Sequence, residues 1–221
     1  MKQMWTDLDH YIETHLIPED PILTQTLKHT DDRGYPDHLA VTPNQGMLLQ
    51  MFIQMNGCKR ILELGTFAAY STMWLARALP EDGYILTIEG RDAHAAVAQE
   101  NIDQAKLKQT IDLRVGRAAA ILKSVPADTA PFDFIFIDAD KQSYPEYLEL
   151  SLNLSRSGTL IFLDNVIRAG DIINPDNHKP SIEGIREMFK LMQEHPRLLS
   201  STALQTVGSK GHDGFALAIV K

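Results

Sequence analysis

The sequence is poor in features that stabilise secreted proteins or anchor proteins in membranes. It has a single cysteine, Cys58, among 221 residues, so an intramolecular disulfide framework is excluded and a buried free thiol is predicted. No apolar run approaches the roughly 18 residues that indicate a membrane span. The segment 1–7 soon becomes acidic and has no secretory hydrophobic region. These absences predict a cytoplasmic protein.

Common catalytic and nucleotide-binding signatures are also missing. The chain has no P-loop, no GxSxG elbow and no CxxC pair, and its eight histidines show no metal-ligand spacing. The net charge of −8 argues against a general nucleic-acid-binding surface, although a local basic patch is compatible with it. Its 44% hydrophobic and 23% charged residues are ordinary for a soluble globular protein. This length predicts one domain, residues 1–221.

The chain divides into a helical first part and a second part in which strands and helices alternate. Residues 1–58 carry helical patterns without a strand signal and are predicted to form an N-terminal cap region. Thr42 and Pro43 are typical of a helix start, and Gly57 is typical of a helix end. Between the predicted helices, residues 31–38 form a polar loop placed to cover a site. Residues 59–221 are predicted to form the core.

Alternation in the second part predicts an α/β fold built on a parallel sheet with right-handed crossovers. The last two strands are joined by about nine residues with no helix between them, which predicts an antiparallel pair. The predicted strands cover residues 60–64, 84–88, 111–115, 132–137, 159–163, 199–205 and 215–220. The predicted helices cover residues 72–79, 93–105, 118–123, 145–154 and 182–194.

Two of the apolar strands end abruptly on oxygen-bearing side chains. Asp138 follows the strand 132–137, and Asp164 and Asn165 follow the strand 159–163, with Lys141 close behind the first. Ligands gather outside the carboxyl ends of parallel strands, so these side chains are expected to converge. Oxygen ligands without cysteine or histidine favour Mg²⁺, with Mn²⁺ or Ca²⁺ as alternatives. The competing interpretation is that the acids only cap helices or form turns.

Residues 61–71 read as a strand, a tight turn and a helix start. The GxGxxG fingerprint is absent, because Phe67 and Tyr70 occupy the later glycine positions. This disfavours NAD and FAD, whose pyrophosphate needs those glycines. In a cofactor without phosphates, Glu63 is placed to meet an ammonium group and Ser71 to meet a carboxylate. An ordinary strand-to-helix turn is the alternative.

Two later positions fit the remainder of such a cofactor. Glu89 ends the second predicted strand, where an acid commonly accepts both ribose hydroxyls. It reads equally well as a solvated loop acid. The segment 116–118, which includes Ala118, closes the third strand and is placed beside an adenine edge.

These motifs together resemble those of the cation-dependent O-methyltransferases of the catechol and caffeoyl-CoA type, which use S-adenosylmethionine. The resemblance is carried by residues 63–71, 132–144, 164–170 and 208–218, and spans roughly residues 35–221. It implies a class I methyltransferase (Rossmann-like) fold, with a seven-stranded, mostly parallel sheet, an antiparallel last strand and helices on both faces. It also implies a homodimer.

The resemblance assigns roles to individual positions. The cofactor is expected to be held by Val41, Glu63, Gly65, Thr66, Ser71, Glu89, Ala118, Asp138 and Asp140. The metal is expected on Asp138, Asp164 and Asn165, with Lys141 as the base and Asp138 sharing the catalytic centre. Substrate contacts are expected from His38, Tyr144 and Arg168.

One position departs from the family pattern. The family usually has glycine at the position of Ala69, and it often has glycine at the position of Ala68 as well. If position 69 requires a positive φ, alanine costs about 1 kcal/mol of strain. Its methyl group would otherwise crowd the cofactor carboxylate. Either cause predicts that glycine at position 69 tightens cofactor binding.

The reaction implied is methylation of one hydroxyl of a small ortho-dihydroxy aromatic molecule. A phenol with a pKa near about 10 is mostly protonated at neutral pH, so a cation and a base are needed to ionise it. A second candidate is methylation of a hydroxylated uridine in tRNA, which needs only a local basic face. A third, a non-catalytic nucleotide-binding module, is disfavoured by Lys141 and the oxygen triad.

Overall fold

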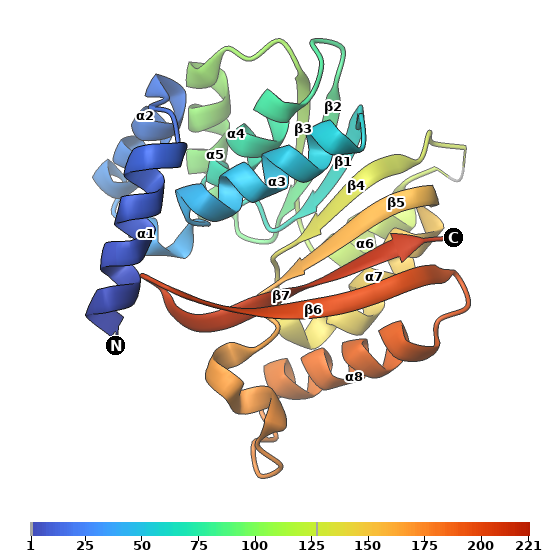
Figure 1. Cartoon of the computed structure of the whole chain (residues 1–221). Helices are drawn as coiled ribbons and strands as arrows, with labels where there is room; N and C mark the ends of the chain where they lie inside the picture. Colours follow the sequence, from blue (N-terminus) through green and yellow to red (C-terminus); the bar gives the residue numbers. More distant parts are fainter. Residues whose placement is uncertain (1, 127) are drawn as a thin grey trace.

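A mixed sheet forms the centre of the computed structural model, which describes residues 2–126 and 128–221 (Figure 1). Within these residues the sheet has seven strands in the order β3-β2-β1-β4-β5-β7-β6. The strands are β1 (Arg60–Leu64), β2 (Tyr84–Glu89), β3 (Thr110–Val115), β4 (Phe132–Ile137), β5 (Ser155–Asp164), β6 (Leu198–Gly208) and β7 (Gly211–Val220). β1 to β5 are mutually parallel and β7 is antiparallel to both of its neighbours. The predicted fold class is confirmed.

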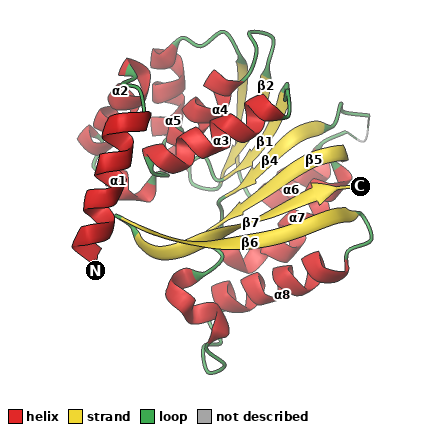
Figure 2. Ribbon diagram, viewed as in Figure 1, coloured by secondary structure: helices red, strands yellow, loops and turns green. Residues whose placement is uncertain are grey.

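Helices cover both faces of this sheet (Figures 1 and 2). The α-helices are α1 (Lys2–Leu16), α2 (Pro21–Asp32), α3 (Pro43–Met55), α4 (Tyr70–Ala78), α5 (Asp92–Ala105), α6 (Ala118–Ser124), α7 (Tyr144–Asn153) and α8 (Pro180–Glu194). Short 3₁₀ turns lie at η1 (Asp37–Leu39), η2 (Lys141–Ser143) and η3 (Arg168–Ile173). Among the described residues, no helix is long and apolar enough to cross a membrane.

Alternation along the buried strands divides the core into two layers. Ile61, Phe134 and Phe136 face one side of the sheet and pack with α2, α3, α4 and α5. Leu62 and Ile135 face the other side and pack with α6, α7 and α8. Because both faces are covered, the strands read as continuous apolar runs instead of alternating ones. Cys58 is buried in the first layer, and burial raises the pKa of its thiol to about 12.

The final strands differ from the prediction. β6 and β7 form a long hairpin in which Gly208 pairs with Gly211, so the turn is much shorter than the nine-residue linker expected. β6 is the edge strand and most of its residues are exposed. Thr206, His212 and Asp213 therefore belong to the strands, although the sequence analysis placed them in the linker. The hairpin tip rests on α1, where Asp9 Oδ2 accepts the N–H of Ser209 at 2.7 Å (Figure 1).

The chain reverses direction across the sheet between β1 and β4. From β1 it runs outward to β2 and β3, then returns to β4 and β5 on the other side. Ligands in open α/β sheets bind beside the carboxyl ends of the strands at such a switch point. In this protein that point lies between Gly65, after β1, and Asp138, after β4.

Asp133 fixes the opposite end of these strands. It is buried in β4, and its carboxylate accepts the N–H groups of Lys59 at 2.7 Å and Arg60 at 2.9 Å. Arg156 Nε donates to the same carboxylate at 2.8 Å. Burial works against its ionised form, but these donors prevail and hold the pKa of Asp133 below its usual value. The side chain thereby joins the starts of β1, β4 and β5.

We expect Asp133→Asn to lower the free energy of unfolding by about 1–3 kcal/mol, because a neutral amide leaves buried donors without a charged acceptor. The stabilisation by Asp133 is present above the unfolded aspartate pKa of about 3.9 and is lost as the pH falls through the lower folded pKa. The acid side of a stability–pH profile, measured by urea unfolding, should therefore be flatter in the variant. Asp82→Asn is the matched control, since exposed Asp82 also pairs with residue 59, at 3.3 Å. An equal effect of both substitutions would contradict this account.

Candidate active site

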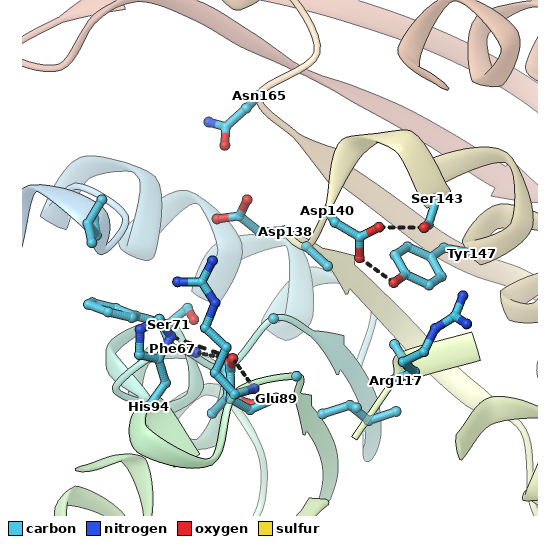
Figure 3. A pocket seen from close by; sticks show the side chains of 18 of the residues that line it. Phe67, Ser71, Glu89, His94, Arg117, Asp138, Asp140, Ser143, Tyr147 and Asn165 are labelled. Atoms are coloured by element: carbon cyan, nitrogen blue, oxygen red, sulfur yellow. Dashed lines mark hydrogen bonds and ion pairs between the residues drawn. The ribbon is translucent and has the colours of Figure 1, made fainter. Parts of the chain in front are cut away.

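A cavity of about 700 Å³ opens at the switch point of the sheet. This volume is within the range typical of small-molecule sites. Its walls come from the carboxyl ends of β1, β2 and β4 and from the helix starts that follow them (Figure 3). Of the residues expected to bind cofactor or metal, the cavity is lined by Val41, Gly65, Thr66, Ser71, Glu89, Ala118, Asp138, Asp140 and Asn165.

The turn from β1 into α4 is tightly constrained. Gly65 has a φ of +97°, and a Cβ there would lie 2.0 Å from the carbonyl oxygen of Asp138. Phe67 and Ala69 also adopt left-handed conformations, with φ of 51° and 66°. The conditional expectation of positive φ at Ala69 is therefore met. Ala69 is fully buried and lies outside the cavity lining, so the structure does not support the alternative of carboxylate crowding.

Glu63 requires a correction. It is completely buried, and its carboxylate accepts hydroxyl hydrogen bonds from Ser71 (2.6 Å), Thr72 (2.6 Å) and Thr87 (2.7 Å). Burial raises the pKa of Glu63 to about 7, although all three hydroxyls favour its ionised form. Because Glu63 does not line the cavity, the direct contact expected with a ligand ammonium is not available. Its visible role is to orient Ser71, which does line it.

Glu89 lies on the cavity wall at the end of β2. One carboxylate oxygen accepts the N–H of Phe67 at 2.8 Å, and the other accepts the N–H of Arg91 at 3.0 Å (Figure 3). An ionised carboxylate has about four acceptor positions, so two remain for a ligand. Glu89 is 7% exposed and lines the cavity.

Several lining residues were not predicted as site residues. Tyr147 and Ser143 both donate hydroxyl hydrogen bonds to Asp140, so α7 and η2 hold that acid in place (Figure 3). Phe67 and His94 line the cavity and meet edge to face, with ring centroids 5.0 Å apart. No spacing pattern in the sequence points to these four residues. Only their proximity to predicted site residues could have found them, because they follow Asp140, Gly65 or Glu89 within a few positions.

The acidic strand ends converge as predicted from the sheet. Ile137 pairs with Leu163, so Asp138 and Asp164 leave neighbouring strands side by side. Asn165 lines the cavity together with Asp138, and its amide points toward that carboxylate (Figure 3). Lys141 Nζ lies 2.6 Å from Asp138 Oδ1, and the lysine side chain is only 10% exposed.

Asp164 is the most buried of these oxygen-bearing side chains, with 5% of its surface exposed. Burial and the nearby Asp138 raise its pKa to about 7, while Lys141 and the Gln45 amide act in the opposite direction. Two carboxylates and an amide at neighbouring strand ends are oxygen donors of the kind that a hard divalent cation prefers. No group of three His, Cys, Asp or Glu side chains that could hold a metal occurs in the described residues, so the candidate set depends on the Asn165 amide as its third donor.

The three expected substrate residues do not reach the cavity. Tyr144 is fully buried, and its hydroxyl lies 3.0 Å from the Ile137 carbonyl and 2.8 Å from the Asp164 carbonyl. It therefore ties together the ends of β4 and β5 and cannot contact a substrate in this arrangement. His38 is exposed outside the lining, and Arg168 turns to Asp213 at 3.7 Å.

Comparisons with known proteins agree with this geometry. A family model described as O-methyltransferase matches residues 13–218. A catechol O-methyltransferase from Niastella koreensis is 46% identical over 220 residues, covering 99% of each chain. The solved O-methyltransferase from Bacillus cereus, in complex with SAH, has a TM-score of 0.95, 45% identity and full coverage of both chains. An O-methyltransferase from Streptomyces achromogenes, in complex with SAM, has a TM-score of 0.93 and 38% identity, covering 100% of this chain and 98% of the other.

A family model spanning nearly the whole chain, close relatives and a matching fold lead to one conclusion. The chain belongs to the O-methyltransferase family.

Proposed function

We propose that this enzyme transfers a methyl group from S-adenosylmethionine to one hydroxyl of a small catechol, in a reaction that depends on a divalent cation. The observation that carries the proposal is the position of Asp164 and Lys141 directly beside Asp138. Asp138 and Asn165 line the cavity, whereas Asp164 and Lys141 lie behind its lining. The relative from Niastella koreensis, a catechol O-methyltransferase at 46% identity, supports the same substrate class.

The cofactor would occupy the side of the cavity formed by β1, β2 and α6. The start of α4 offers backbone N–H groups without intrahelical partners, and these together with Ser71 would bind a carboxylate. Glu89 has two acceptor positions left for the ribose hydroxyls. Ala118 and Asp140 would flank the adenine, and Val41 would close the cavity beside the reacting centre. The complexes of relatives with SAH and SAM support this assignment.

The cation would be held by Asp138, Asp164 and Asn165, whose oxygens suit Mg²⁺, with Mn²⁺ and Ca²⁺ as alternatives. When bound, it would supply a positive charge that positions the two adjacent hydroxyls and favours their ionised form. Tyr144 supports this arrangement from within the core, because its hydroxyl lies 2.8 Å from the carbonyl oxygen of Asp164.

Lys141 is the group placed to take the hydroxyl proton, because a divalent cation beside it would disfavour its ammonium form and leave the neutral amine as the base. Its Nζ lies 2.6 Å from Asp138 and 5.0 Å from the ring centroid of Tyr144, so it is held directly beside Asp138. The acceptor oxygen then forms a bond to the methyl carbon, and the bond from that carbon to the sulfonium sulfur breaks. Positioning the two reactants could itself contribute roughly 7–11 kcal/mol.

Two further expectations accompany this function. The cytoplasmic location and the homodimer both stay predictions, and light scattering on the purified protein tests the second. Methylation of tRNA receives no support from a specific observation, and the net charge of −8 counts against it.

Removal of divalent cations should abolish methyl transfer, and added Mg²⁺ or Mn²⁺ should restore it, because the proposed ligands are oxygen atoms that bind such ions. Activity on a catechol is measured in excess EDTA and after readdition. S-adenosylmethionine binding, followed by calorimetry in EDTA, is the control and should persist. Full activity in excess chelator would remove the cation from the proposal.

Lys141→Met should lower kcat for a catechol while leaving its binding largely unchanged, since the cation still holds both hydroxyls. The assay compares caffeic acid with the monophenol p-coumaric acid in the wild type and the variant. The wild type should prefer caffeic acid strongly, by about 10⁴, because a monophenol lacks one of the chelating oxygens. Lys123→Met is the control, since exposed Lys123 pairs only with Glu146 among the described residues. Comparable rates on both acids would defeat the chelation mechanism.

Ala69→Gly should raise the free energy of unfolding by up to about 1 kcal/mol, because glycine adopts the left-handed conformation without strain. We expect this gain to be larger than the loss caused by the greater conformational entropy of glycine in the unfolded chain. This strain is already present without a ligand, so S-adenosylmethionine affinity should change little. That replaces the tighter binding predicted from sequence. Lys106→Gly, at a left-handed helix end with φ of 49°, is the stability control. Calorimetry that finds markedly tighter cofactor binding would show that position 69 changes conformation on binding.

A further inference from the structure

Gln45 contacts the candidate cation site from a distant part of the chain. Its Nε2 donates to Asp164 Oδ2 at 2.7 Å, across 119 positions of sequence. Gln45 lies in the first turn of α3, where Thr42 Oγ1 accepts its backbone N–H at 3.2 Å. A Thr-x-x-Gln pattern usually forms a reciprocal capping box, in which the glutamine side chain returns to the threonine N–H. In this protein the side chain is directed to Asp164 instead.

The helix that carries Gln45 is held firmly in place. The next residue, Gly46, packs so closely against Trp74 that a Cβ would lie 2.4 Å from the indole Nε1. Just before the helix, Val41 lines the cavity. The close packing of α3 against the Trp74 side chain of α4 therefore fixes the backbone from which Gln45 extends.

The immediate partners of Asp164 are electrically neutral. Its Oδ1 accepts the backbone N–H of Asn165 at 2.8 Å, and its Oδ2 accepts the amide of Gln45. The nearby ammonium of Lys141 is bonded to Asp138 instead, at 2.6 Å. Two neutral donors fix the plane of the carboxylate without adding a positive charge to balance it, and acceptor positions remain on both oxygens.

We propose that Gln45 is a positioning residue of the cation site, whose amide orients the Asp164 carboxylate toward the ion held with Asp138 and Asn165. This inference rests on the proposed cation-dependent function. Groups that hydrogen-bond metal ligands typically contribute 10–100-fold in metal affinity. A neutral amide suits this position, because a carboxylate would repel Asp164 and an ammonium would compete with the cation for it.

The test is Mn²⁺ binding to the full-length protein, measured from free Mn²⁺ by electron paramagnetic resonance. Gln45→Leu and Gln45→Met both remove the donor, and the second keeps an unbranched side chain of similar length. We expect each to weaken Mn²⁺ binding by about 10–100-fold. Gln54→Leu, at an exposed position of the same helix, is the matched control and should bind Mn²⁺ as the wild type does.

Two further readouts separate positioning from a general structural effect. In the Gln45 variants the Mn²⁺ concentration for half-maximal rate should rise by the same factor, while kcat at saturating Mn²⁺ recovers. S-adenosylmethionine affinity and the thermal midpoint without metal should match those of Gln54→Leu. Loss of cofactor affinity in parallel with metal affinity in both Gln45 variants would overturn the positioning role.

The wild type and Asp164→Asn are titrated in the same experiment. If the wild type binds Mn²⁺, Asp164→Asn loses it and the Gln45 variants retain wild-type affinity, the inference about Gln45 is overturned and the proposed cation site stands. If the wild type itself binds no Mn²⁺, both the inference and the cation dependence are overturned.

Discussion

The close approach of two strand ends determines the geometry of the whole site. After β1 the chain passes so near to β4 that a Cβ on Gly65 would lie 2.0 Å from the Asp138 carbonyl oxygen. Backbone hydrogen bonds hold this contact, from Asp138 N–H to Leu64 at 2.8 Å and from Gly65 N–H to Ile88 at 2.9 Å. The cavity lies at this junction, so the cofactor side and the acidic side share one rigid wall.

A buried carboxylate, Asp164, next to a partly buried one, Asp138, is costly, and the surrounding structure is organised to hold both. Asp138 has the ammonium of Lys141, whereas Asp164 has only neutral donors from Gln45 and Asn165. Burial and the neighbouring acid raise the pKa of Asp164 to about 7. The cation proposed for this site would offset the cost of this incompletely neutralised acid pair.

Rigid support for the acids comes from parts of the chain that never touch the cavity. Tyr144 joins the carbonyls at the ends of β4 and β5 from within the core. Glu63 performs a similar task on the other side, where it accepts the hydroxyls of Ser71 and Thr72 beneath the lining. Both residues were expected to contact ligands, and in the structure both instead orient the residues that can.

The sequence by itself determined the elements and the strand ends that carry the chemistry. Continuous apolar runs identify the parallel strands, and polar residues directly after them must meet at one edge of the sheet, so Asp138, Asp164, Glu89 and Gly65 could be placed in advance. The tertiary structure decided which side chains reach the cavity, because periodicity reports burial of a segment but not the distant segment that packs against it. The contact from Gln45 to Asp164 and the burial of Tyr144 depend on such packing. The sequence also predicted too long a linker between β6 and β7. An exposed edge strand has the polar composition of a loop, so composition alone did not show where the strands end.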